Sequence, residues 1–253
     1  MFTNAIVRTP CQALVEGITT ARLGVPDYSK ALEQHAAYTE ALKACGLTVT
    51  VLPTDENFPD STFVEDTALL TPHCAIITNP GAESRRGEID AMIPVVEDLF
   101  DRVEFIDAPG TVEAGDIMMV GDHYYIGLSA RTNHIGAMQM ITFLEKHGMG
   151  GSIVSLSEVL HLKTGLSYLE NNNLLVCGEF IDKPEFSEFN RLIINPDEAY
   201  AANSLWVNDT VIVPLGFSNT QKLIEAAGYE TLTVDVSEFQ KIDGGLSCLS
   251  LRF

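Results

Sequence analysis

Apolar positions along the chain follow helical and extended spacing in turn, and this alternation repeats. Residues Ser29–Cys45 carry apolar side chains at helical spacing before Gly46, which predicts a helix that ends at the glycine. The β-branched run Leu47–Leu52 then predicts a strand. Three further helix-then-strand pairs are predicted at Glu88–Phe100 with Val103–Ile106, Ala130–His147 with Ile153–Leu156, and Thr220–Ala227 with Thr231–Val236. The pattern predicts a mixed α/β fold.

A second motif, in which polar residues precede an apolar strand, also repeats. Its five copies align at Glu65, Gly115, Gly165, Asn203 and Gly245, with spacings of 50, 50, 38 and 42 residues. Periods of this length are typical of radial or solenoid arrays, in which neighbouring units complete each other's cores. Ordinary βαβ alternation with chance similarity explains the pattern equally well. From the pattern alone, both interpretations stay open.

A radial array would bring equivalent strand starts to one axis. The side chains at these positions are polar and mostly acidic: Glu65, Asp66, Glu113, Asp116, Thr164, Asn203, Asp243, Ser247 and Cys248. Such a set is costly to bury without partners. An acidic central cavity that binds a cation would satisfy it.

Composition narrows the class of protein. The chain has 253 residues, is 46% hydrophobic, and contains no Pro/Gly/Ser-rich linker, so we expect a single domain spanning residues 1–253. A formal charge of −20 would repel nucleic acid and attract a small cation, although solubility alone would also explain it. No apolar run approaches the length of a membrane span, and the N-terminus lacks an apolar leader. Five cysteines, an odd number without metal-finger spacing, fit reduced thiols in the cytoplasm.

Two residues could carry nucleophilic chemistry. Cys248 follows Gly244 and Gly245, which would allow a close backbone approach beside the thiol. His161 could act as the acid/base partner of a thiol. A buried strand cysteine and a core histidine between two leucines are the alternatives.

Charged side chains that could bind a guanidinium or a carboxylate lie in four segments. Asp60, Glu65 and Asp66 form a cluster, and the adjacent Glu65 and Asp66 would point to opposite faces at a strand start. Glu113 could pair with a guanidinium in a bidentate manner, and Arg85 and Arg131 could hold a carboxylate in the same way. Capping or solvated turns are the alternative. Nucleotide-binding and metalloprotease motifs are absent from the sequence.

Taken together, these segments resemble the dimethylarginine dimethylaminohydrolases of the guanidino-modifying, or pentein, superfamily. The resemblance runs from Phe2 to Phe253. Its longest blocks are Pro26–His35, Phe58–Asp66, Cys74–Glu88, Pro109–Val120, His161–Gly165 and Ile242–Phe253. It implies a five-bladed α/β propeller with pseudo-fivefold repeats, in agreement with the repeated motif.

The resemblance also implies the roles of individual residues. Cys248 matches the nucleophile, His161 the acid/base, and Glu113 the carboxylate that orients His161 or holds the guanidinium. Substrate contacts are implied for Ile18, Asp60, Glu65, Asp66, Arg85, Arg131 and Ile242, with Ile18 in a lid loop at Leu14–Gly24.

The implied reaction converts methylated arginines to citrulline and a methylamine, through a thiouronium intermediate and without a metal or organic cofactor. The expected partner is a small cationic amino acid. A homodimer is left open. An arginine or agmatine deiminase, an amidinotransferase and a non-catalytic propeller are the alternatives.

Overall fold

The computed structural model describes all 253 residues. The chain divides into two compact units, and each is described by itself. The first unit comprises Met1–Val64 with Gly165–Phe253, and the second comprises Glu65–Thr164. No helix combines the length and the apolar character that crossing a membrane requires.

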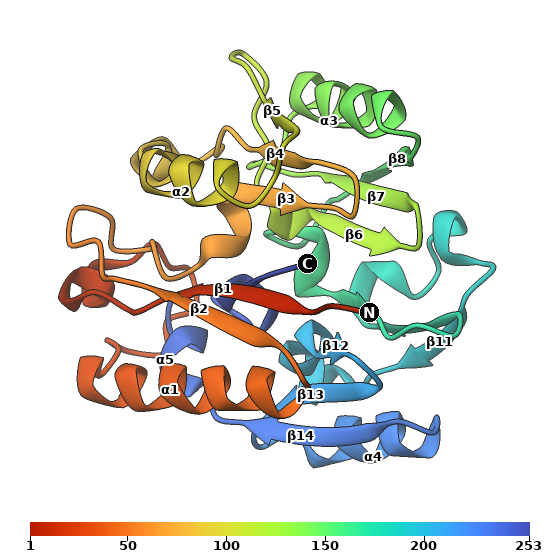
Figure 1. Cartoon of the computed structure of the whole chain (residues 1–253). Coiled ribbons are helices and arrows are strands. Elements are labelled where there is room, and N and C mark those ends of the chain that lie inside the picture. Colours follow the sequence, from red (N-terminus) through yellow and green to blue (C-terminus); the bar gives the residue numbers. More distant parts are fainter. The chain divides into compact units, whose positions relative to one another are not determined.

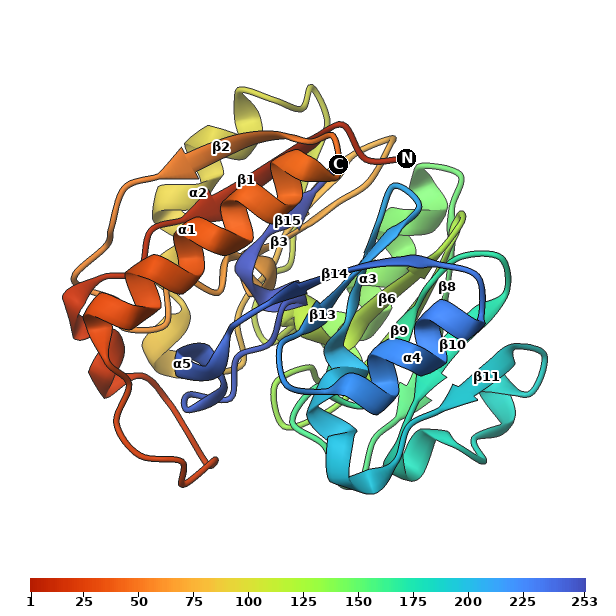
Figure 2. The same cartoon turned by 90° about the horizontal axis from the view of Figure 1, so that it is seen from below.

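The first unit contains three sheets of three strands (Figures 1 and 2). In sheet order, their strands are β15 (Leu251–Arg252), β1 (Asn4–Arg8) and β2 (Thr48–Leu52); β12 (Leu205–Val207), β13 (Thr210–Pro214) and β14 (Glu230–Val234); and β11 (Asn190–Ile193), β10 (Asn173–Val176) and β9 (Leu166–Tyr168). Its α-helices are α1 (Tyr28–Ala44), α4 (Ser218–Ala226) and α5 (Ser237–Gln240). Helix α1 packs against β2 and β14, and α4 lies along β14 (Figure 2). The main core of the unit lies beneath α1 and includes Tyr38, Leu42, Phe63 and Phe239.

The second unit contains two sheets of the same kind (Figure 1). In sheet order, their strands are β3 (Ala68–Leu70), β4 (Ala75–Ile77) and β5 (Val103–Phe105), and β6 (Ile117–Val120), β7 (His123–Leu128) and β8 (Gly150–Ser155). Its α-helices are α2 (Glu88–Glu97), which contacts β4, and α3 (His134–Lys146), which packs against β7 and β8. The core joins β4, β6 and β7 to α3 through residues such as Ile76, Ile117, Tyr124 and Met140.

All five sheets share one pattern. The middle strand pairs antiparallel with one neighbour and parallel with the other. Parallel neighbours need a crossover connection, usually a helix. Helices α1, α2, α3 and α4 provide it in four sheets, whereas in the fourth along the chain the short 3₁₀ helices η6 (Gly178–Phe180) and η7 (Pro184–Phe186) take its place. The five predicted repeats are confirmed, as are the four predicted helices.

Three of the predicted helices end at glycines with left-handed backbone, as expected. The φ angles are +90° at Gly46, +82° at Gly148 and +98° at Gly228. Glycine adopts this left-handed region with little strain because it has no Cβ. The predicted start of α3 is wrong by four residues. Asn133 accepts the backbone N–H of Gly136 through its side chain, and this N-cap fixes the first turn at His134.

In each sheet, one outer strand pairs antiparallel with the middle strand, and a 3₁₀ helix precedes that outer strand. These helices are η2 (Val64–Thr67), η4 (Ala114–Asp116), η5 (Leu162–Thr164), η8 (Pro196–Asn203) and η9 (Ser247–Leu249). The prediction that Glu65 and Asp66 lie at a strand start is therefore wrong, because both belong to η2, and both side chains are buried. The fifth copy of the motif is also shifted, because η9 separates Gly245 from β15.

Candidate active site

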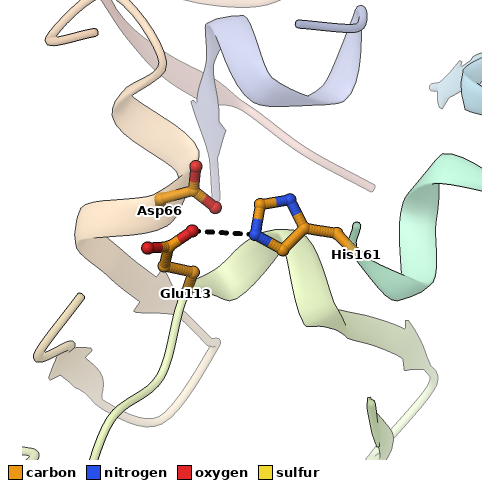
Figure 3. Close-up of side chains that lie close together, drawn as sticks. All are labelled: Asp66, Glu113 and His161. Carbon is orange, nitrogen blue, oxygen red and sulfur yellow. Dashed lines mark hydrogen bonds and ion pairs between the residues drawn. The ribbon is translucent and has the colours of Figure 1, made fainter. Parts of the chain in front are cut away.

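His161 and Glu113 form a buried pair in the second unit (Figure 3). The His161 Nε2 atom lies 2.8 Å from Glu113 Oε2. His161 directly precedes η5, and Glu113 directly precedes η4; the two 3₁₀ helices pack against each other. The ring lies against the backbone of Gly115, where a Cβ would be only 3.0 Å from His161 Nδ1 and 3.0 Å from Asp66 Oδ1. A residue without a side chain at position 115 thus lets the imidazole and two carboxylates come together.

Asp66 is held on the other side of this cluster by one backbone and one side-chain donor. Its Oδ1 accepts the N–H of Gly115 at 2.9 Å, and its Oδ2 accepts a bond from Arg85 Nη1 at 2.6 Å. Arg85 also donates from Nε and Nη2 to the two oxygens of Glu88, at 2.9 and 2.8 Å. Such a bidentate pair fixes the plane of the guanidinium. The structure thus places Arg85 in a buried ion-pair network, and its predicted contact to a substrate carboxylate stays a prediction.

The carboxylates determine the charge of His161. Burial disfavours the imidazolium, but Asp66, the hydrogen bond to Glu113 and the charge of Asp116 outweigh burial and raise the pKa of His161 to about 9. Burial likewise disfavours the charged form of Glu113, yet His161, Arg85 and Arg131 lower the pKa of its carboxyl to about 2. At neutral pH the pair is therefore an imidazolium and a carboxylate.

Arg131 contacts the same carboxylate. Its Nη1 lies 3.2 and 3.3 Å from the two oxygens of Glu113, and its side chain is partly exposed at 16%. Glu65 accepts a bond from Lys163 Nζ at 2.7 Å. Of the predicted site residues, the second unit brings Asp66, Arg85, Glu113, Arg131 and His161 into one connected network.

The cluster also offers ligand types that suit a metal ion. One ligand atom each from Asp66, Glu113 and His161 lies within 4.8 Å of the others. Protein cations already balance these carboxylates, because Arg85 bonds Asp66 and the imidazolium bonds Glu113. The set is therefore an ion-pair network rather than a dedicated metal centre.

Cys248 lies in the first unit, in η9, and its side chain is partly buried against the main core. The preceding residue is fixed by Asn203, whose Oδ1 accepts the N–H of Ser247 at 2.8 Å while its Nδ2 donates to Ser247 Oγ at 3.0 Å. A Cβ on Gly245 would lie 2.5 Å from Asn203 Oδ1. Gly245 thus allows the Asn203 side chain to approach closely, and the expected backbone approach beside the thiol stays a prediction.

The other predicted residues of the first unit also converge. The backbone N–H of Ile18 donates to Asp60 Oδ1 at 3.1 Å. A Cβ on Gly17 would meet Asp60 at 3.0 Å and the Ile242 side chain at 3.4 Å. The predicted lid loop continues to Thr20, whose N–H bonds Asp243 Oδ2 at 2.6 Å. The loop is thus docked on the segment that carries Ile242.

Two residues of the second unit's network were not predicted from the sequence. Glu88 reads as an ordinary acidic residue in the first turn of a helix, and only its spacing of three residues from Arg85 hinted at a pair. Gly115 was part of the repeated motif but had no assigned role. Its contact with His161 joins segments that are 46 positions apart in the sequence.

Comparison with known proteins gives matches along the whole chain. A family model described as N,N dimethylarginine dimethylhydrolase, eukaryotic, matches residues 27–249. An N(G),N(G)-dimethylarginine dimethylaminohydrolase of Pseudomonas aeruginosa is 60% identical over 254 residues, and the match covers 100% of both chains.

Two solved structures are similarly close. A cysteine-to-serine mutant of the Pseudomonas aeruginosa enzyme in complex with citrulline has a TM-score of 0.99 at 60% identity, with 100% of both chains covered. A dimethylarginine dimethylaminohydrolase with a histidine-to-glycine substitution, in an adduct with S-methyl-L-thiocitrulline, has the same TM-score, identity and coverage. The predicted fold class is confirmed by these matches.

Proposed function

Because the chain belongs to the dimethylarginine dimethylaminohydrolase family, we propose that it hydrolyses Nω-methylated arginines to citrulline and methylamine or dimethylamine. Relatives crystallised with citrulline and with a thiocitrulline adduct support this substrate class. The observation that carries the proposal is the buried His161–Glu113 pair beside Asp66. It combines a proton donor with carboxylates that suit a cationic guanidinium.

In the proposed reaction, Cys248 loses its thiol proton to solvent, and its sulfur attacks the guanidinium carbon to form a neutral tetrahedral adduct. His161, protonated at neutral pH, gives its proton to the methylated nitrogen, and the C–N bond breaks to release the amine. The carbon stays bonded to sulfur as an S-alkylthiouronium. Two smaller steps thus replace one difficult displacement.

The second half of the reaction reverses the role of His161. Having lost its proton, the imidazole accepts one from water, whose oxygen attacks the thiouronium carbon. The C–S bond then breaks as the carbonyl of citrulline forms, and the hydroxyl proton of the adduct passes to the departing sulfur. His161 keeps the proton that it took from water and so returns to its imidazolium form. Glu113 keeps the ring oriented through both halves by its bond to Nε2.

Charge complementarity supports the substrate contacts that we propose. Asp66, with Glu65 beside it in η2, would bind the guanidinium nitrogens, and Asp60 the α-amino group. Arg131, which is more exposed than Arg85, is the better supported contact to the α-carboxylate.

The backbone at Ile18 and Ile242 completes the proposed substrate contacts. The approach of both residues to Gly17 and Asp60 supports this assignment. We also propose a single catalytic domain, located in the cytoplasm, where five free thiols would stay reduced.

The direct test is to incubate the purified protein with asymmetric dimethylarginine and to quantify citrulline and dimethylamine. We expect both products in equal amounts, and little citrulline from arginine or agmatine. Arginine turnover as fast as that of dimethylarginine would instead indicate a deiminase.

A second measurement tests the covalent step. In His161→Gly, mass spectrometry of a quenched reaction should show either no adduct or a persistent adduct on Cys248, with slow turnover. His73→Gly, a substitution of an exposed histidine in the turn before β4, is the matched control and should turn over normally. Normal turnover by His161→Gly would contradict the acid/base assignment.

A further inference from the structure

Asp116 is a fully buried carboxylate of the second unit that has no part in the reaction described above. Its Oδ2 accepts a bond from the Ser129 hydroxyl at 2.6 Å. Its Oδ1 accepts the backbone N–H of Leu162 at 2.9 Å. Leu162 directly follows His161, so this bond holds the backbone that carries the imidazole.

Two hydroxyls extend the contacts of Asp116 to other functional residues. Ser129 Oγ accepts the backbone N–H groups of Arg131 and Thr132, at 2.9 and 3.2 Å. Thr132 Oγ1 accepts the backbone N–H of Glu113 at 3.1 Å, and the Thr132 side chain also bonds Asp116. Burial raises the pKa of the Asp116 carboxyl, and the charge of His161 and the hydroxyls of Ser129 and Thr132 act against burial. In its ionised form Asp116 can only accept hydrogen bonds, so both hydroxyls give their protons to it and turn their lone pairs toward backbone N–H groups.

We propose that Asp116 is a positioning residue that fixes the acid/base His161 and the carboxylate-binding Arg131 in one geometry. The proposal rests on the proposed function. One buried carboxylate joins segments 113–116, 129–132 and 161–162, which hold three of the residues that the reaction requires. Through them it sets the spacing between the group that binds the α-carboxylate and the group that protonates the departing amine.

The charge of Asp116 adds a second effect on His161. The charged groups of this unit that act on His161 are Asp66, Glu113 and Asp116, and all three favour the imidazolium against burial. An uncharged side chain that only filled this space would not favour the imidazolium of His161. The pH dependence of the reaction thus separates a positioning role from a merely structural one.

Asp116→Asn is the central variant because it keeps the shape and changes the bonding. The new amide nitrogen would face Ser129 Oγ and donate to it, but this oxygen already accepts the backbone N–H groups of Arg131 and Thr132. One of the three N–H donors would therefore lose its acceptor. We expect kcat for asymmetric dimethylarginine to fall at least tenfold. The alkaline limb of the kcat/KM profile should move about one pH unit lower, because one nearby negative charge is lost.

Ser129→Ala is the complementary variant, since it breaks the tie to Arg131 but keeps the charge. It should raise KM for dimethylarginine several-fold, leave the alkaline limb in place, and leave KM for an alkylguanidine without a carboxylate unchanged. Asp122→Asn, at an exposed turn, is the matched control and should match the parent. The proposal is overturned if Asp116→Asn matches Asp122→Asn both in kcat and in the position of the alkaline limb, or if its loss of activity equals its loss of folded protein.

A measurement without turnover keeps this proposal apart from the proposed function. NMR titration of the His161 ring in isotope-labelled protein should give a lower midpoint in Asp116→Asn than in the parent. A parent that makes no citrulline would refute the proposed function, while the titration would still decide the role of Asp116. If Asp116→Asn does not fold, Ser129→Ala decides, and an unchanged KM for dimethylarginine overturns the proposal.

Discussion

Replacement of Glu113 by glutamine would show how strongly the carboxylates hold the proton of His161. The pKa of His161, about 9, lies above its ordinary value of 6.5 by an amount that corresponds to roughly 3 kcal/mol. A hydrogen bond to a charged group contributes about 1.5–3 kcal/mol, or about one to two pKa units. Glu113→Gln keeps the side-chain shape but loses the charge. We expect the His161 midpoint to fall to between about 7 and 8.

The free energy of unfolding should also depend on whether His161 carries its proton. The folded protein binds it more tightly than the unfolded chain, so His161 stabilises the fold fully below about pH 6.5 and loses this contribution as the pH rises through about 9. From this group the free energy of unfolding of the parent should fall by up to roughly 3 kcal/mol across that window. The decrease should be smaller in Glu113→Gln.

NMR titration of the His161 ring and urea unfolding at several pH values would measure both effects. Glu97→Gln, an exposed substitution on α2, is the matched control and should leave the midpoint unchanged. A His161 midpoint near 6.5 in the parent, or equal midpoints in the parent and Glu113→Gln, would refute the reasoning.

Three further substitutions test other parts of the site. Cys248→Ser should lower kcat by at least about three orders of magnitude with binding preserved, because a hydroxyl is a far weaker nucleophile than a thiol. Calorimetric binding and steady-state rates would measure both effects. A variant that keeps more than a tenth of the parental kcat would exclude Cys248 as the nucleophile. Arg131→Ala should raise KM for dimethylarginine but not for a guanidine without an α-carboxylate; equal losses would indicate a structural role. Gly115→Ala should lower kcat by about a hundredfold in folded protein, because the new Cβ would displace the His161 ring or Asp66; unchanged kcat would show that the cluster adapts.

Local signals determined much of the fold from the sequence. The helix ends at Gly46, Gly148 and Gly228 depend only on nearby residues and on the freedom of glycine to adopt positive φ, and the structure confirms them. The fivefold repeat was also readable, because each copy reuses the order of polar turn and strand, and four of the five copies add an α-helix. The 3₁₀ helices before the strands were missed, since short polar segments have no strong spacing pattern.

For the site, the sequence and the family resemblance selected the residues, and the tertiary structure decided what those of each unit do to one another. His161 as an isolated residue between leucines gives no sign of a raised pKa; that shift requires Asp66, Glu113 and Asp116, which lie 95, 48 and 45 positions away. Asp116 itself looked like one more strand-start carboxylate, and its two hydroxyl partners appear only when β7 brings Ser129 to it. Hydrogen bonds of this kind join distant segments, so no local pattern encodes them. The sequence determines which charged and polar residues are present, but packing sets the distances between them, and the hydrogen bonds and pKa shifts of the site depend on those distances.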